Sequence, residues 1–66
     1  MTKFQFTHSG QVDSKTAELA SSKTIRAFNA DEALEILARE IADEAGWPSI
    51  AACRSHLFEH FCAAEV

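Results

Sequence analysis

Thiol and imidazole side chains are the most reactive groups in this chain of 66 residues, and most of them lie near its C-terminus. Cys53, His56 and His60 follow an i, i+3, i+7 spacing, which places them at neighbouring positions of one predicted helix. Both groups ligate zinc, but a structural zinc site takes four ligands. We therefore expect Cys53 to belong to the core, the histidines to flank it, and no metal or cofactor to be bound. A metal-stabilised interaction module is kept as an alternative.

No pattern in the sequence indicates catalysis. A cysteine–histidine pair needs a third group that orients the base, and none is evident here. The chain has only two glycines, Gly10 and Gly46, so it holds no glycine-rich phosphate loop. We expect a protein that is not an enzyme.

The two cysteines, Cys53 and Cys62, are nine residues apart on the same predicted helix. That separation corresponds to ~13.5 Å along the helix axis, which is too far for a disulfide within one chain. Free thiols indicate a reducing compartment, and we expect the cytoplasm. An intermolecular disulfide is the alternative.

Negative charge is concentrated in the second half of the chain. Residues 1–28 hold four cations and two carboxylates (+2), and residues 29–66 hold two cations and eight carboxylates (−6), which gives a net charge of −4. The predicted helix at 30–45 carries two like-charge i,i+4 pairs, Asp31/Glu35 and Glu40/Glu44, each costing roughly 0.2–0.5 kcal/mol. Local rules that are broken without local gain mark candidate functional sites.

The acidic face of this helix is therefore the candidate site for a protein partner. Its carboxylates spread over the whole predicted solvent arc, and Ile36 is expected to be exposed among them as an apolar anchor. From Asp31 to Glu44 the helix rises ~20 Å, or one charge per about 3.3 Å, close to the spacing in a single nucleic-acid strand. A face that only keeps the protein in solution is the alternative. The candidate partner-binding residues are Asp31, Glu32, Glu35, Ile36, Glu40, Asp43 and Glu44.

The periodicity predicts the elements that carry these residues. Strands are expected at about 2–8 and 23–28, and helices at about 30–45 and 48–63. Asn29 should cap the first of these helices and Gly46 should end it. The fold class is α+β: a small antiparallel sheet of two or three strands packed against two C-terminal helices, in one domain spanning 1–66.

Three further expectations concern the rest of the core. Residues 11–22 fit either a short helix capped by Asp13 or Ser14 or an extended, partly paired segment, and the polar composition favours the extended form. Trp47 should pack at the corner between the helices. The second helix should bury one stripe, made of Ile50, Cys53, Leu57, Phe61 and Ala64.

Composition and the lengths of the apolar runs argue against a disordered chain, a membrane-spanning protein and a secretory signal. At 47% hydrophobic and 24% charged residues the chain is typical of a globular domain. No apolar run approaches the ~20 residues of a membrane span. The segment MTKFQFTHSG has no apolar stretch, so it is not expected to be a secretory signal.

Residues 39–57, REIADEAGWPSIAACRSHL, resemble the helix-turn-helix of bacterial DNA-binding regulators at Ile41, Ala42 and Gly46. The later positions depart from that pattern, since Ala52 and Ser55 stand where larger apolar residues are usual. The segment is also acidic, whereas DNA affinity comes largely from neutralised phosphates. A DNA-binding regulator is kept as an alternative function.

The strand-to-helix junction IRAFNADEAL, within residues 25–46 of a very small acidic α+β chain, resembles the phage- and mobile-element-encoded anti-CRISPR proteins. This resemblance implies a non-enzymatic inhibitor that occupies the basic DNA-binding surface of a CRISPR effector complex, as a DNA mimic, in the host bacterial cytoplasm. The implied partner is a protein, with no direct binding of nucleic acid or membrane. Antitoxins and other inhibitors of nucleic-acid enzymes are also small and acidic, and they would resemble this chain in the same way.

Overall fold

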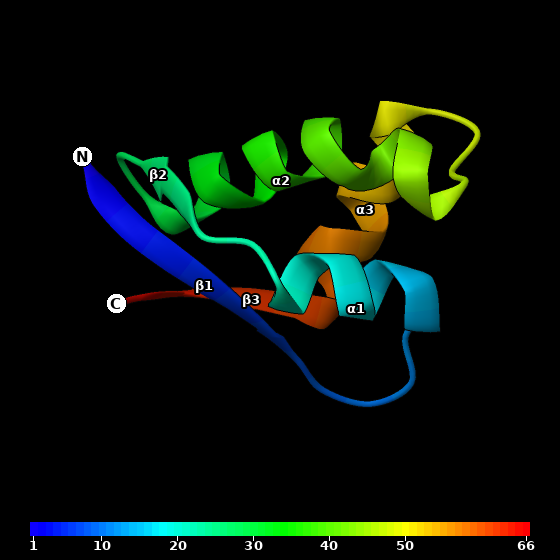
Figure 1. Cartoon of the computed structure of the whole chain (residues 1–66), viewed down its shortest axis with the longest axis horizontal. Helices are drawn as coiled ribbons and strands as arrows, with labels where there is room; N and C mark the ends of the chain where they lie inside the picture. The colour runs from blue at the N-terminus through cyan, green and yellow to red at the C-terminus, as the bar shows by residue number, and fades with distance from the viewer.

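The computed structural model describes all residues from 1 to 66, in the order β1–α1–β2–α2–α3–β3 (Figure 1). The strands are β1 (Thr2–His8), β2 (Ile25–Ala27) and β3 (Phe61–Glu65). The helices are α1 (Ser14–Ser21), α2 (Ala30–Ala45) and α3 (Ile50–His60). The predicted α+β class, with an antiparallel sheet and two helices after the first two strands, is confirmed.

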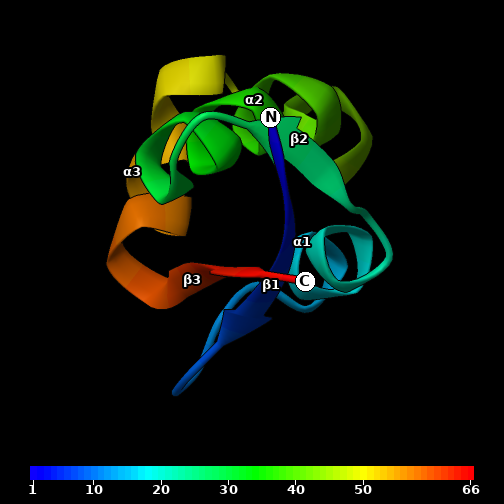
Figure 2. The ribbon, with the colours of Figure 1, turned by 90° about the vertical axis from the view of Figure 1, so that its left-hand side faces the viewer.

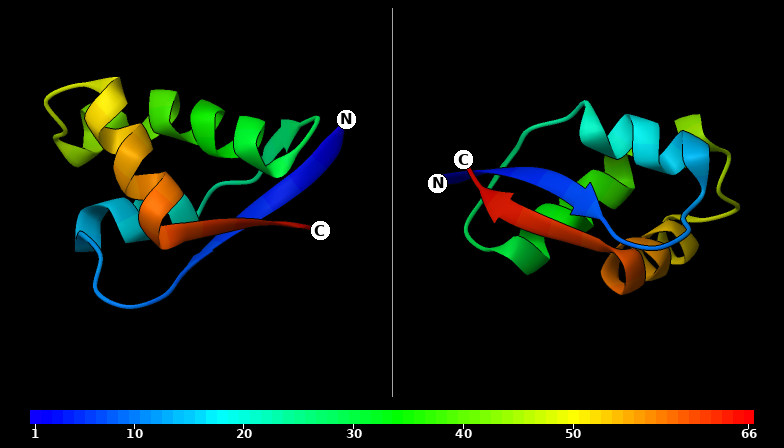
Figure 3. Two further views of the ribbon diagram at one scale, coloured as in Figure 1. Left: turned by 180° about the vertical axis from the view of Figure 1, so that it is seen from behind. Right: turned by 90° about the horizontal axis from the view of Figure 1, so that it is seen from below.

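Alternation along β1 explains how the sheet is covered. Phe4 and Phe6 are buried, while Lys3, Gln5 and Thr7 between them are exposed. The strand order is β2-β1-β3, with Phe4 opposite Ile25 on one side and Phe6 opposite Ala63 on the other. The helices lie on the face that carries the phenylalanines, and the opposite face of β1 and β3 is open when seen from below (Figure 3, right).

Helix α2 has the predicted bounds and the predicted caps. The side chain of Asn29 accepts a hydrogen bond from Glu32 N–H at 2.8 Å, and Gly46 ends the helix with φ of 82°. The Glu32 carboxylate in turn accepts from Phe28 N–H at 2.8 Å, one residue earlier than a standard capping box would place it. These bonds fix the start of the helix that carries the acidic face.

The prediction of an extended segment at 11–22 is wrong, because Ser14–Ser21 form helix α1. Asp13 caps it: its carboxylate accepts from Thr16 N–H at 3.0 Å and from the Thr16 hydroxyl at 2.8 Å. Thr16 and Ala20 are fully buried. Tertiary burial, together with a strong cap, stabilises a helix that would be too short to persist alone.

The prediction of a helix over 48–63 is wrong at both ends. Ser49 caps α3, accepting from Ala52 N–H at 3.1 Å, so the helix begins at Ile50. It ends at His60, and the next five residues form β3, which pairs with β1 from Phe4 to His8. Pairing satisfies the backbone groups along one side of β1, which a longer helix would leave without partners.

The predicted stripe of buried residues is accordingly correct only in part. Cys53, Leu57 and Phe61 are buried, although Phe61 contributes from β3 rather than from the helix. Ile50 is 49% exposed and Ala64 is also exposed, contrary to expectation. The change from helix to strand after His60 alters the periodicity from 3.6 to 2, which moves Ala64 to the open face of the sheet.

The core holds 14 buried residues contributed by all six elements or their flanks, and Leu37, Ile41 and Leu57 are its largest fully buried side chains. Trp47 packs at the corner between α2 and α3 as predicted, and its indole N–H donates to the Thr16 hydroxyl at 2.9 Å. That bond ties α1 to the corner. None of the three helices combines the length and apolar composition needed to cross a bilayer.

Candidate functional site

The acidic face lies on the outside of α2, the helix that forms the upper edge of the molecule in Figure 1. Asp31, Glu40, Asp43 and Glu44 are exposed. Glu32 and Glu35 are half-buried. The opposite side of α2 is buried against the sheet and the other helices through Ala33, Leu34, Leu37, Ala38, Ile41 and Ala42. The predicted acidic residues therefore share one helix surface that is open to solvent.

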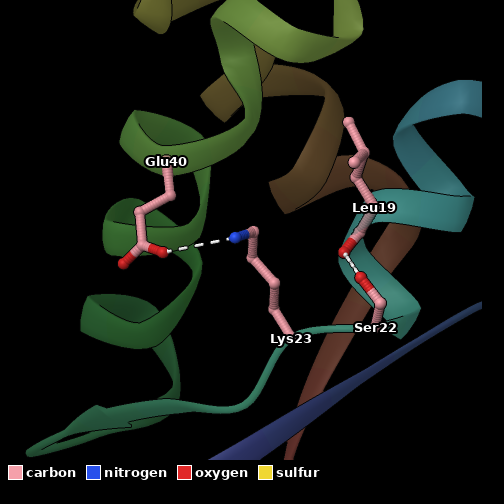
Figure 4. A network of polar contacts seen from close by, with 4 residues as sticks. All are labelled: Leu19, Ser22, Lys23 and Glu40. Atoms are coloured by element: carbon pink, nitrogen blue, oxygen red, sulfur yellow. Dashed lines mark hydrogen bonds and ion pairs between the residues drawn. The ribbon is translucent and has the colours of Figure 1, made fainter.

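Internal partners occupy three of these six carboxylates. Glu32 binds the backbone N–H of Phe28, and Glu35 lies 3.5 Å from the Arg39 guanidinium. Lys23, from the segment between α1 and β2, extends toward α2 and places its ammonium 3.7 Å from Glu40 (Figure 4). Both ion pairs are partly exposed, so each contributes only about 0–1 kcal/mol.

The remaining three carboxylates have no cation within ion-pair distance. They are Asp31 in the first turn of α2, and Asp43 and Glu44 in its last turn. In the first turn a carboxylate is favoured by the helix dipole; in the last turn it is disfavoured. Asp43 and Glu44 are thus the carboxylates for which the fold provides neither a partner nor a favourable field.

The expectation that Ile36 is an exposed anchor is wrong. Ile36 is half-buried and packs against the core cluster, because α2 is covered over a wider arc than its apolar stripe alone predicts. Exposed apolar groups lie instead at the two ends of the helix: Phe28, 72% exposed, just before α2, and Ile50, 49% exposed, just after its C-terminal turn. The outward position of Phe28 was already signalled by its alternation with the buried Ala27.

A shallow cleft of about 220 Å³ lies at the corner between α2 and α3. Its size is below the ~300–1,000 Å³ of most small-molecule sites. Arg39 and Asp43 give it charges of both signs, so it selects neither an anion nor a cation. The lining residues are Arg39, Ala42, Asp43, Trp47, Pro48, Ser49 and Ile50.

The three histidines belong to one aromatic cluster with Trp47 and Phe61. The His56 ring lies between those of Trp47 and His60, tilted against both, with centroid distances of 5.0 and 4.8 Å, and the His8 ring lies 5.5 Å from that of Phe61. No group of three or more His, Cys, Asp or Glu side chains is arranged to hold a metal ion. The Nε2 atom of His56 is buried without a hydrogen-bond partner. The arrangement is an aromatic cluster that joins α3 to β3.

The cap of α1 should make stability depend on pH. The backbone and hydroxyl hydrogen bonds from Thr16, helped by the nearby His56, hold the pKa of the Asp13 carboxyl below its ordinary value. A carboxyl with a lowered pKa stabilises the folded state above its unfolded pKa of about 3.9, and the contribution disappears as pH falls through the folded value. We expect Asp13→Ala to melt below the parent at pH 7, with the gap closing in strong acid.

Thermal melts between pH 7 and pH 2 test this expectation. Ser14→Ala, at the adjacent exposed position, is the control and should follow the parent at every pH. A gap between the Asp13→Ala variant and the parent that stays constant from neutral to strongly acidic pH would contradict it.

The two thiols should react at very different rates. Both cysteines are free; Cys53 is fully buried in α3 and Cys62 is exposed on β3. Burial also raises the pKa of the Cys53 thiol, which lowers its thiolate fraction. We expect one fast thiol per native chain in a titration with an aromatic disulfide reagent, and a second only on unfolding. Cys62→Ser should abolish the fast phase, and a persistent fast phase would show that Cys53 is accessible.

The alternative DNA-reading unit, residues 39–57, offers little positive charge. The exposed surface of α3 carries one arginine, Arg54, whose guanidinium lies over the Phe58 ring at 5.2 Å from its centroid. A duplex reader gains most of its affinity from several phosphate contacts.

Comparison of the chain with protein-family models, with curated proteins and with solved structures finds no match in any of the three.

Proposed function

We propose that this protein is a small non-enzymatic inhibitor whose acidic α2 face binds the basic nucleic-acid-binding surface of a protein partner. The observation that carries the proposal is the pair Asp43 and Glu44: exposed, without an ion-pair partner, and placed where the helix dipole disfavours them. A basic partner surface would supply the missing counter-charge.

The sharpest form of the proposal is an anti-CRISPR-type inhibitor that blocks target recognition by a CRISPR effector complex. Such complexes hold nucleic acid in a positively charged channel. An acidic helix can occupy that channel, and charge complementarity accelerates the encounter at low salt. Phe28 and Ile50, exposed at the two ends of α2, provide apolar contacts beside the charges.

Two binding measurements separate this function from that of a DNA-binding regulator. In the first, fluorescence anisotropy follows a labelled duplex on addition of the protein at moderate salt. In the second, the labelled duplex contains the target sequence of a purified CRISPR effector complex and is first bound to that complex. The protein is then added as a competitor. We expect no change in the first experiment and release of the duplex in the second.

The opposite pattern identifies a DNA-binding regulator: the protein binds the duplex directly and with sequence preference, and it does not compete for the DNA-binding surface of the effector complex. If the protein neither binds DNA nor competes with it on a panel of such complexes, the inhibitor proposal fails. The acidic face would then serve to keep the protein in solution.

A further inference from the structure

The edge strand β3 presents backbone groups that have no partner within the chain. In the strand order β2-β1-β3, only β1 pairs with β3, and no strand lies along its other side (Figure 2). Two hydrogen bonds fix its orientation: Ser9 N–H donates to His60 O at 3.3 Å, and Val66 N–H donates to Lys3 O at 3.1 Å. Backbone groups alternate sides along a strand, so the even-numbered residues face β1 and the odd-numbered ones face outward.

The outward-facing residues are Phe61, Ala63 and Glu65. The N–H of Phe61 is already bonded to Leu57 O at the end of α3. The free groups are therefore the C=O of Phe61 and both backbone groups of Ala63 and of Glu65. If two copies of β3 run antiparallel with their Ala63 residues opposite each other, each free N–H of Ala63 and Glu65 meets a free C=O of the other copy.

We propose that β3 pairs antiparallel with β3 of a second copy of this chain, around a two-fold axis at Ala63. The two Ala63 residues exchange a pair of hydrogen bonds, and each Glu65 N–H donates to the Phe61 C=O of the other copy. The two three-stranded sheets then form one continuous sheet. The pairing uses no carboxylate of the acidic α2 face, so it is independent of the proposed function.

The side chains of β3 leave the edge open to such pairing. Cys62 and Ala64 are small and exposed, the strand has no proline or lysine, and its one charged residue, Glu65, lies at its C-terminal end. Edge strands are normally protected by such residues or by being very short. The other edge strand, β2, has only three residues and carries the exposed Arg26. β3 is therefore the longer and less protected edge of the sheet.

Sedimentation equilibrium of the whole chain from micromolar to millimolar concentration tests the proposal. We expect the average mass of the parent to rise toward that of a dimer. Ala63→Pro removes the outward N–H at the centre of the pairing and leaves the bonds to β1 intact, a position where edge strands tolerate proline. We expect it to weaken association by about tenfold or more, because the two central hydrogen bonds are lost.

Two single lysine variants, one at the edge strand and one at the central strand as its control, provide a second test if the proline variant fails to fold. Ala64→Lys places a charge on the open face beside the two-fold axis. Gln5→Lys adds the same charge to the same face of the central strand, opposite Ala64 in the register. We expect Ala64→Lys to stay monomeric and Gln5→Lys to dimerise like the parent. A parent that is monomeric at millimolar concentration, or a dimer that survives Ala64→Lys, overturns the proposal.

Discussion

Leu37→Ala is expected to bring the protein to the limit of its stability. Leu37 lies at the centre of α2 and is fully buried. Truncating a buried leucine to alanine costs about 2–5 kcal/mol, because the cavity closes only in part. A chain of this length has a total stability of roughly 3–10 kcal/mol at about 0.05–0.15 kcal/mol per residue. One substitution therefore removes a large share of the free energy of unfolding.

Urea unfolding followed by circular dichroism measures this loss. Leu19→Ala is the matched control, since Leu19 is only half-buried and packs at the margin of the same core. We expect a small shift of the urea midpoint for Leu19→Ala and a folding transition at or near zero urea for Leu37→Ala. Equal midpoints for the two variants would mean that the core is not centred on α2.

The second large effect is expected on binding rather than on folding. In the triple variant Glu40→Gln, Asp43→Asn, Glu44→Gln, the last two turns of α2 lose their negative charge. Removing Asp43 and Glu44 relieves an unfavourable contact with the helix dipole. Losing the half-exposed Lys23–Glu40 pair costs about 0–1 kcal/mol. We expect a melting temperature within a few degrees of the parent, and association with a basic partner slower by about tenfold or more at low salt.

A second triple variant with the same change of net charge serves as the control: Glu18→Gln, Glu59→Gln, Glu65→Gln. These three carboxylates are exposed and lie outside α2. We expect this variant to bind the partner as the parent does, with the same dependence on salt. If both triple variants weakened binding equally, only the net charge would matter, and α2 would not be the contact.

The elements with clear local signals were predictable from the sequence. Helix α2 combines an apolar stripe with Asn29 and Gly46 at its ends, and the structure has the predicted bounds. Strand β1 alternates clearly between buried and exposed residues. Helix α1 was weighed only as the less favoured form of residues 11–22, because part of its stability comes from contacts with distant residues, such as the bond from Trp47 to Thr16.

The strand β3 was missed for a related reason. The segment FCAAE has helix-forming residues and continues the apolar spacing of α3, so local periodicity favours a longer helix. Its actual conformation depends on pairing with β1, more than fifty residues earlier in the chain. A short sequence carries no local record of such long-range pairing.

The sequence predicted which carboxylates lie on the surface of α2, but it did not predict their ion pairs or the burial of Ile36. The helix surface that carries the carboxylates follows from a period of 3.6 residues, and the structure places them on one face. The pairing of Lys23 with Glu40 joins two elements and could not be derived from spacing along one helix. The burial of Ile36 likewise depends on how widely neighbouring elements cover α2.

We propose that the acidic face of α2 displaces nucleic acid from a basic protein surface. The most direct test is a gel-shift titration of a purified CRISPR effector complex bound to its labelled target duplex, with the parent and the two triple variants added in parallel. We expect release of the duplex by the parent and by the Glu18/Glu59/Glu65 control at similar concentrations, and little release by the Glu40/Asp43/Glu44 variant. Release by the Glu40/Asp43/Glu44 variant at the same concentration as the parent would contradict it.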